Sequence, residues 1–304
     1  AVGIGYRQDG RDREVRCGRE VVLSGGAINS PQVLLLSGIG PAAHIKSHGI
    51  AVAHDLPGVG ENLQDHYQAR CIFRCAKPVT LNDVMRSPWR KMLTGLDYVT
   101  RRRGMLTIGA GAVGMFARTR PGLATPDVEY HIIMFSADRP GGGLHPFSGF
   151  TVSVCQLRPD SRGTITLKSA DPLSAPAIRP NYLAEEADWK MLVEGMKLTR
   201  RIAKTQALAP WVEAEHVPGK DVQTDDELLD YVRRAGTTIF HPAGTCKMGP
   251  DPMAVVDARL RVHGLRGLRV ADASIMPTVV SGNTNAACVM IGEKAAAMLR
   301  EDRA

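Results

Sequence analysis

A short apolar strand that leads through paired glycines into a helix is the feature that most constrains how this chain can fold. Residues 20–23 predict the strand, and Gly25 and Gly26 predict the turn that follows it. We expect the helix to begin at Ser30 and Pro31, because serine caps free helix amides and proline fits the first helical position. Strand, glycine turn and helix in succession are typical of α/β nucleotide-binding domains. The sequence therefore predicts an α/β domain at this end of the chain.

The middle of the chain, from about residue 68, predicts an antiparallel sheet that carries helices. The expected strands lie at 72–74, 128–135, 150–156 and 164–167, and the expected helices at 89–102 and 187–204. The second helix is amphipathic, with Leu192, Met196 and Ile202 spaced to face a core. This segment indicates a second domain.

The last segment returns to the character of the first, with a strand at 268–272 and a helix from about 286 to 297. Near the start, strands at 2–6 and 14–17 flank an Asp-Gly turn and predict a β-hairpin. We expect a mixed fold, α/β plus α+β, in which a partial Rossmann-like domain is interleaved with an antiparallel-sheet substrate domain. The expected boundaries are 1–67 and 241–304 for the Rossmann-like domain and 68–240 for the substrate domain.

Composition excludes several classes of function. With 304 residues, 44% apolar and 23% charged, the chain has the make-up of a globular protein that can bury a sizeable core. The net charge is +7, but the densest basic run, 101–103, is typical of a solvated face, and 5% aromatic residues give no stacking platform for nucleic acid. No apolar run is long enough to span a bilayer. We expect no nucleic-acid partner and no transmembrane segment.

The six cysteines are scattered, which favours free thiols in a reducing compartment. The one close pair, Cys71 and Cys75, has no second pair or His-x-His partner to complete a zinc site. We therefore expect no metal site and a cytoplasmic location, with peripheral attachment to a membrane left open.

Two glycine-rich segments imitate a dinucleotide-binding turn. Residues 109–114 match G-x-G-x-x-G, but a basic run and a glycine precede them in place of a buried strand. Residues 38–43 match a looser form, but they end a helix. We expect neither segment to hold a pyrophosphate.

His241 lies in the richest segment, 240–249, where a His-Pro pair meets a turn rich in glycine and threonine. Irregular backbone is where functional residues concentrate, and a histidine pKa near neutral suits proton abstraction from an alcohol. An exposed or structural loop histidine is the ordinary alternative. Further on, Asp272 ends a strand where it could hold hydroxyls of a ribityl or ribose chain. Asn283 and Asn285 open a helix, and plain helix capping is their alternative role.

Four motifs in this order resemble the glucose–methanol–choline (GMC) oxidoreductase family, and within it choline dehydrogenase and related bacterial alcohol dehydrogenases. The first of them matches one of the family's two signature patterns, and the resemblance covers essentially the whole chain. The motifs lie at 25–40, 56–66, 241–249 and 268–294.

The resemblance implies roles for individual residues. His241 falls on the position of the family's active-site histidine, and Asn283 on a second catalytic position that holds Asn or His. The remaining matches fall on positions that touch or flank FAD, namely Gly25, Gly26, Asn62, Asp272, Ala273, Thr284 and Asn285. For His66, which closes the second motif, a structural role is the better interpretation.

The implied reaction is FAD-dependent oxidation of a primary alcohol, choline-like or aliphatic, to the aldehyde. His241 takes the hydroxyl proton, the α-carbon hydride moves to flavin N5, and Asn283 donates a hydrogen bond to the developing alkoxide. The expected partners are a small-molecule alcohol and an electron acceptor, either oxygen or a quinone-like carrier, with the carrier favoured. Choline would call for aromatic or carboxylate groups around its quaternary ammonium.

The sequence departs from the family in one respect. Relatives begin with a strand, G-x-G-x-x-G and a helix that hold the ADP half of FAD, and no properly placed match occurs here. We therefore expect this chain alone to bind FAD weakly or not at all, to be inactive by itself, and to have an exposed sheet edge. The alternatives to a partly known alcohol dehydrogenase are a non-catalytic remnant and an NAD enzyme that uses residues 109–114.

Overall fold

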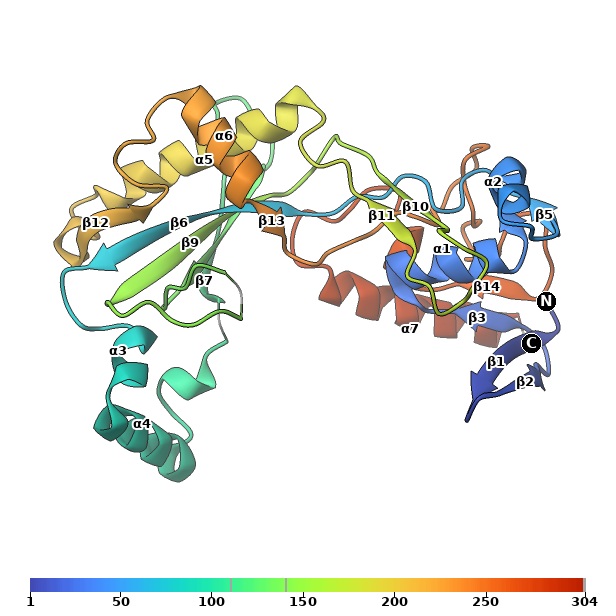
Figure 1. Cartoon of the computed structure of the whole chain (residues 1–304), viewed down its shortest axis with the longest axis horizontal. Helices are drawn as coiled ribbons and strands as arrows, with labels where there is room; N and C mark the ends of the chain where they lie inside the picture. The colour runs from blue at the N-terminus through green and yellow to red at the C-terminus, as the bar shows by residue number, and fades with distance from the viewer. Residues whose placement is uncertain (110, 140, 303–304) are drawn as a thin grey trace. The chain divides into compact units, whose positions relative to one another are not determined.

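The computed structural model describes residues 1–109, 111–139 and 141–302, which form two compact units. The first unit comprises Ala1–His66, Arg158–Ala184 and Phe240–Ala304, and the second comprises Tyr67–Leu157 and Glu185–Ile239 (Figure 1). The outer boundaries fall within one residue of those expected at 67 and 240. The expected substrate domain 68–240 is nevertheless wrong in one respect, because residues 158–184 belong to the first unit.

Backbone pairing explains why residues 158–184 leave the second unit. Within the segment, β10 (Thr164–Thr166) pairs with β11 (Ala177–Arg179). Gly163 exchanges backbone hydrogen bonds with Leu63, and the Ile165 amide donates to the Gly60 carbonyl at 2.7 Å. Leu167 then joins the buried core of the first unit. Such long-range pairing leaves no local signal in the sequence.

The first unit opens with the expected hairpin, β1 (Gly3–Gln8) antiparallel to β2 (Arg11–Arg16). Asp9 and Gly10 have φ angles of 52° and 73° at its turn, as a tight hairpin requires. The expected strands around 20–23 and 268–272 form β3 (Val21–Leu23) and β14 (Leu268–Val270), which pair in parallel as a two-stranded sheet.

Helix α1 (Gly26–Leu36) corrects the predicted helix start at Ser30. The helix begins four residues earlier, so Pro31 lies inside it, where proline lacks the amide that would bond the Ala27 carbonyl. The buried Thr245 hydroxyl donates to that carbonyl at 2.6 Å and replaces the missing bond. A residue more than 200 positions away therefore makes the early start possible.

Shorter elements and one long helix complete the first unit. Its apolar core includes Leu34, Leu35, Ile45, Val255 and Val270, all 1% exposed or less. The remaining elements are β4 (Ile39–Gly40), α2 (Ala42–Ser47), β5 (His54–Asp55), the 3-10 turn η3 (Ala273–Ile275) and α7 (Asn285–Glu301).

The second unit is built on an antiparallel six-stranded sheet, as the sequence predicts. Its order is β12-β6-β9-β8-β7, and β13 also pairs with β6. The strands are β6 (Tyr67–Cys75), β7 (Gly111–Ala117), β8 (Val128–Ile133), β9 (Gly149–Gln156), β12 (Val212–Val217) and β13 (Thr237–Thr238). Residues 111–114 of the G-x-G-x-x-G match are thus part of a strand and not of a strand–turn–helix unit; Ala110 lies outside the described residues.

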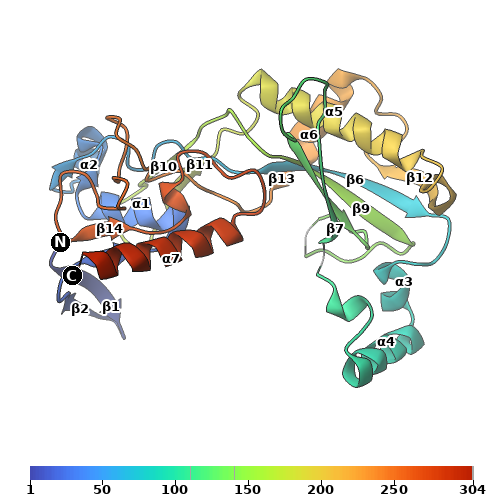
Figure 2. The same cartoon turned by 180° about the vertical axis from the view of Figure 1, so that it is seen from behind.

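Helices α5 (Glu186–Ala203) and α6 (Asp225–Ala235) lie over one face of this sheet, as both views show (Figures 1 and 2). A Cβ at Gly195 of α5 would come within 2.5 Å of Val154 Cγ1, so the glycine permits close packing of helix and sheet. The other helical elements are α3 (Leu81–Arg86), α4 (Pro88–Arg101), η1 (Met105–Thr107) and η2 (Ala209–Trp211). Across the described ranges, no helix has the length and apolar composition that a membrane span requires.

Candidate active site

His241 stands at the centre of a polar cluster in the first unit. The residue before it, Phe240, has a φ of 64°, a conformation that non-glycine residues seldom adopt and that recurs at functional sites. His241 Nδ1 lies 2.9 Å from His66 Nδ1, and His241 Nε2 lies 3.4 Å from Asn283 Nδ2. The two residues that the sequence singles out for catalysis are therefore brought together across 42 positions.

The two contacts assign the tautomer of His241. An amide Nδ2 can only donate, so Nε2 of His241 is an acceptor and carries a lone pair. Nδ1 then carries the proton and donates it to Nδ1 of the fully buried His66. An imidazole whose Nε2 lone pair is directed at Asn283 is the form that a general base requires.

A buried carboxylate fixes the backbone of the same histidine. The Asp65 Oδ1 atom accepts a hydrogen bond from the His241 amide at 2.8 Å, and Asp65 Oδ2 accepts one from the Tyr182 hydroxyl at 2.5 Å. Asp65 is 8% exposed. His241 is thus held from the ring by His66 and Asn283 and from the main chain by Asp65, residues of two separate segments.

Asn283 and Asn285 are not capping residues. The N-cap of α7 is Thr284, and its side chain makes no capping hydrogen bond. The amino end of α7 therefore presents backbone amides and the positive end of a helix dipole beside Asn283, which is itself exposed. Such an end favours an anion or an electron-rich ring edge.

Asp272 ties the end of β14 to the glycine turn before α1. Its Oδ2 atom accepts hydrogen bonds from the Gly26 amide at 3.0 Å and the Ser30 hydroxyl at 2.5 Å, and its Oδ1 atom accepts one from the Ser274 amide at 2.8 Å. The Ser30 hydroxyl also accepts from the Gly25 amide at 2.9 Å. The expected cofactor residues Gly25, Gly26, Asp272 and Ala273 therefore lie together at the carboxyl ends of the parallel strands.

Asn62 links three loops around this region. Its Nδ2 atom donates to the carbonyls of Gly244 and Pro277 at 3.1 and 3.3 Å, and its Oδ1 atom accepts from Arg162 Nε at 3.1 Å. The Gly244 amide in turn donates to the Ala273 carbonyl at 3.2 Å. The loop that carries His241 is thereby bonded to the segment that carries Asp272.

Comparisons with known proteins identify the family of the chain. The two models of the GMC oxidoreductase family match residues 1–68 and 159–292. The chain belongs to the GMC oxidoreductase family.

Two curated relatives are more than 40% identical to the chain over the residues that align with it. It is 43% identical over 304 residues to an alcohol dehydrogenase (acceptor) of Pseudomonas putida, a match that covers 98% of this chain and 54% of that protein. It is 42% identical over 302 residues to an oxygen-dependent choline dehydrogenase of Pseudomonas putida strain GB-1, covering 99% and 53%. The chain spans about half the length of these curated relatives.

The fold also matches solved structures. A variant of the formate oxidase of Aspergillus oryzae RIB40, studied for FAD modification, superposes with a TM-score of 0.93 at 28% identity. That match covers 99% of this chain and 57% of the oxidase. GMC oxidoreductases are FAD-binding flavoproteins, so the residues near His241 can be tested against that cofactor.

The residues present in this GMC chain fit the part of FAD that carries the flavin. Gly26 has a φ of 76° with open space where a Cβ would lie, so its backbone is accessible to a ligand. The amides at the amino end of α7 suit the electron-rich edge of the ring. The glycine turn and Asp272 follow the carboxyl ends of the parallel strands β3 and β14, the end at which open α/β sheets bind ligands. Gly25, Gly26, Asn62, Asp272, Ala273, Thr284 and Asn285 would hold this part of the cofactor.

Sequence reasoning missed two members of the cluster, Asp65 and Tyr182. Asp65 lies next to His66 in the motif 56–66, so the sequence indicates that it is near the site. Nothing in the sequence indicates that Asp65 bonds the His241 amide. Tyr182 follows β11 in the segment that was assigned to the other domain, and no local pattern marks it. His66, for which the sequence favours a structural role, is completely buried and contacts His241 Nδ1.

The thiols stand apart from this chemistry. Burial raises the pKa of both Cys71 and Cys246, so each remains a neutral thiol at physiological pH. A thiol that is not ionised is a poor nucleophile. Cys246, although it lies in the His241 segment, is therefore a packing residue.

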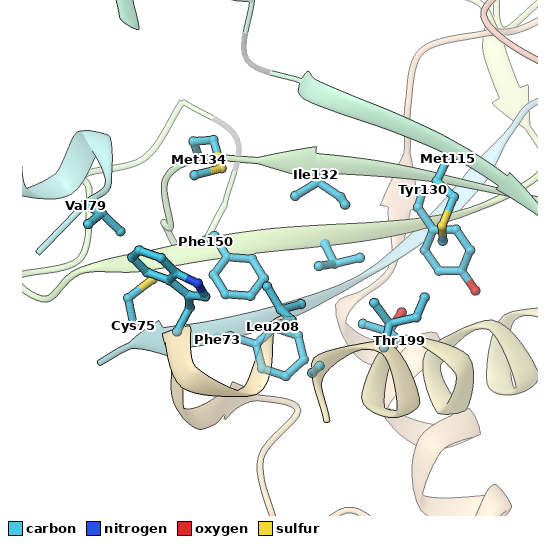
Figure 3. A pocket seen from close by; sticks show the side chains of 14 residues that line it. Phe73, Cys75, Val79, Met115, Tyr130, Ile132, Met134, Phe150, Thr199 and Leu208 are labelled. Carbon is cyan, nitrogen blue, oxygen red and sulfur yellow. The ribbon is translucent and has the colours of Figure 1, made fainter. Parts of the chain in front are cut away.

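The second unit contains an apolar pocket of about 450 Å³ between its sheet and α5 (Figure 3). Phe73, Phe150 and Leu208 are among its lining residues. Its two hydroxyl groups, those of Tyr130 and Thr199, both donate to the Gly195 carbonyl, at 3.0 and 3.1 Å. The pocket therefore offers apolar surface and little that could orient a polar substrate.

The second unit also brings together Asp138, His145 and His216, a grouping that the expectation of no metal site did not foresee. One ligand atom of each lies within 4.8 Å of the others. His145 Nε2 already bonds Asp138 Oδ1 at 2.9 Å. Arg70 donates to the Asp138 carbonyl and Arg74 lies over the neighbouring Phe147 ring, so two guanidinium groups oppose a bound cation. We assign no metal to this group.

Proposed function

We propose that this chain carries the alcohol-oxidising site of an FAD-dependent oxidoreductase that converts a primary alcohol to the aldehyde. The observation that supports this proposal is the pair formed by His241 Nε2 and Asn283 Nδ2, 3.4 Å apart, with the opposite ring nitrogen held by His66. The pair offers one hydrogen-bond acceptor and one donor to the same ligand atom. A hydroxyl group is both a donor and an acceptor, so an alcohol matches it.

The protein's own groups act on the alcohol oxygen. An alcohol that displaces the His241–Asn283 contact gives its hydroxyl proton to His241 Nε2, and Asn283 Nδ2 donates to the oxygen as negative charge develops. The proton on Nδ1 and its bond to His66 hold the ring in the tautomer that can accept. When bound, FAD would supply the oxidising power for this reaction by taking up the two electrons and the hydrogen that the carbinol carbon loses.

Replacement of the base tests the proposal. In the holoenzyme, His241→Ala should lower kcat by roughly a hundredfold to ten-thousandfold, the usual contribution of general base catalysis, with the flavin spectrum retained. His48→Ala, which removes a histidine outside the cluster, should leave kcat unchanged. Unchanged turnover in His241→Ala would remove the assignment.

His66 is a positioning residue, and its replacement has a separate signature. His66→Ala removes the acceptor for His241 Nδ1, so kcat should fall about tenfold to a hundredfold, the scale on which supporting residues act, and its pH profile should shift. His66→Asn retains an acceptor and should restore part of the loss. A merely structural His66 would lower the yield of folded protein and leave the pH profile in place.

The substrate and the electron acceptor need direct measurement. Both choline-like and aliphatic primary alcohols are compatible with the site, and the two relatives described above are an alcohol dehydrogenase and a choline dehydrogenase. We favour a quinone-like carrier over oxygen as the acceptor. A panel of both alcohol classes, assayed with an artificial acceptor and by oxygen consumption, shows which alcohol class is oxidised and which electron acceptor is used. We place the protein in the cytoplasm, a location supported by its six free thiols.

The alternative is a non-catalytic polypeptide that lacks the means to hold the ADP half of FAD. The described residues contain no strand–turn–helix with G-x-G-x-x-G. We expect the 304-residue chain by itself to bind FAD weakly or not at all. Purification with one flavin per chain would contradict that expectation and remove the alternative as well.

A further inference from the structure

The apolar pocket between the sheet and α5 of the second unit is buried at one end and exposed at the other. Figure 3 shows Tyr130 and Thr199 at one end of the pocket, and Val79 and Cys75 at the opposite end. Tyr130 and Thr199 are 0% and 2% exposed. Val79 and Trp211 are 46% and 41% exposed. The pocket therefore has a buried inner end and an open mouth.

Apolar side chains line the space between the two ends. The rings of Phe73 and Phe150, from neighbouring strands, stack with their centroids 5.2 Å apart. The volume of about 450 Å³ falls in the range of small-molecule sites, about 300 to 1,000 Å³. It exceeds the small voids that close-packed protein interiors leave, and apolar cavities take up apolar ligands in preference to water. The pocket therefore favours the apolar part of a ligand.

The mouth of the pocket is cationic. The Ala76 amide donates to the Trp211 carbonyl at 3.0 Å, and Lys77 Nζ lies 4.9 Å from the centre of the Trp211 ring. Arg90 Nη1 donates to the Pro78 carbonyl at 3.5 Å, which places a second cation by the same turn. A negatively charged group at the mouth would be attracted by both cations.

We propose that this pocket binds a fatty acid, with the aliphatic chain along the stacked phenylalanines and the carboxylate at the mouth beside Lys77. Such a ligand combines a chain for the apolar lining with a charge for the cationic rim. A quaternary ammonium is disfavoured, because Lys77 already lies over the Trp211 ring face that would bind it and repels a second cation. The inference does not rest on the proposed redox function, because the pocket uses no residue of the His241 cluster.

Titration of the full chain with straight-chain fatty acids tests the site. From octanoate to decanoate the affinity should rise about fourfold for each methylene, because each one buries more apolar surface. Decyltrimethylammonium, with an equally long chain and the opposite charge, should bind more weakly. Decanoate should change the tryptophan fluorescence, and Trp211→Phe should reduce this change while calorimetry still detects binding. Absence of saturable decanoate binding, or equal binding of decyltrimethylammonium, would overturn the proposal.

A matched pair of lysine variants tests the contact with the carboxylate. Lys77→Gln should weaken decanoate binding about twofold to fivefold, the usual effect of one exposed ion pair. Lys190→Gln is the control, because Lys190 also lies over a tryptophan, 5.7 Å from the centre of the Trp189 ring, but outside the pocket lining. It should leave the affinity unchanged. Equal losses in the two variants would overturn the proposal.

A second pair tests the apolar lining. Leu208→Trp places a larger side chain in the lining and should weaken decanoate binding more than tenfold, because it takes up the space of the chain. Leu173→Trp makes the same change at a position that is 78% exposed in the first unit, and should have no effect. Circular dichroism checks that both remain folded, and the lysine pair decides the matter if Leu208→Trp does not fold. Unchanged decanoate affinity in folded Leu208→Trp would overturn the proposal.

Discussion

The two units stabilise their backbones by different means. In the second unit, strands of six to nine residues pair with one another, and α5 packs on the sheet through a glycine. In the first unit, the strands that flank the glycine turn have only three residues each, and side chains carry much of the bonding instead. Asp65, Asp272, Asn62 and Thr245 each bond the backbone of a distant segment.

This difference shows where precision is needed. Irregular backbone can place a histidine, an amide and a helix end around one point, but it requires specific polar side chains to fix it. A regular sheet bonds itself and depends mainly on the fit of its apolar faces. We therefore expect substitutions to affect the two units through different physics. All three tryptophans lie in the second unit, so their fluorescence reports its unfolding alone.

The largest effect should come from overpacking in the second unit. Gly195→Ala places a Cβ 2.5 Å from Val154 Cγ1 and should destabilise that unit by about 2 to 3 kcal/mol. Gly95→Ala is the matched control, because a Cβ there meets no atom within 4 Å and should stabilise α4 by about 0.5 to 1 kcal/mol. Urea unfolding followed by tryptophan fluorescence measures both. If both substitutions changed the free energy of unfolding in the same direction, the packing argument would be contradicted.

A smaller effect should follow from loss of one hydrogen bond in the first unit. Thr245→Val leaves the Ala27 carbonyl inside α1 without its donor, at a cost of about 1 to 2 kcal/mol. Thr245→Ser keeps the hydroxyl and should lose much less. Hydrogen exchange of the α1 amides should accelerate. The urea midpoint measured by tryptophan fluorescence, which reports the second unit, should not change. If Thr245→Val lowered the urea midpoint measured by tryptophan fluorescence, the two units would unfold together.

The smallest expected effect on stability depends on pH and concerns the ion pairs of Asp302. The guanidinium groups of Arg269 and Arg261 lower the pKa of the Asp302 carboxyl below its ordinary value. A carboxyl with a lowered pKa in the folded state stabilises the protein above its unfolded pKa, and that stabilisation is lost as pH falls through the folded pKa. Asp302→Asn should therefore lower the Tm at neutral pH and approach the wild-type Tm below about pH 3.

Glu301→Gln serves as its control. Glu301 bonds Arg259 at 3.1 Å on the protein surface, so Glu301→Gln should cost no more than one exposed ion pair. A difference in Tm between wild type and Asp302→Asn that stays constant from neutral to acidic pH would exclude the carboxylate as its source.

Much of the fold and of the site could be predicted from residue patterns. The hairpin follows from its Asp-Gly turn, the antiparallel sheet from the strand segments between 72 and 156, and α5 from its amphipathic spacing. His241 and Asn283 were indicated by ordered motifs, and the structure places them in contact. The start of α1 was predicted wrongly because Ser30 and Pro31 have strong local preferences that a distant threonine outweighs.

The sequence by itself determined the mixed fold class, the glycine turn at Gly25 and Gly26, the family resemblance and the candidate catalytic pair, because each depends on residues close together or on motifs in fixed order. Only the tertiary structure decided that residues 158–184 return to the first unit, that Tyr182 and Asp65 fix the His241 backbone, and that the second unit holds an apolar pocket between its sheet and α5. These depend on contacts between segments far apart in the chain, and side-chain packing and long-range hydrogen bonds carry no local sequence signature.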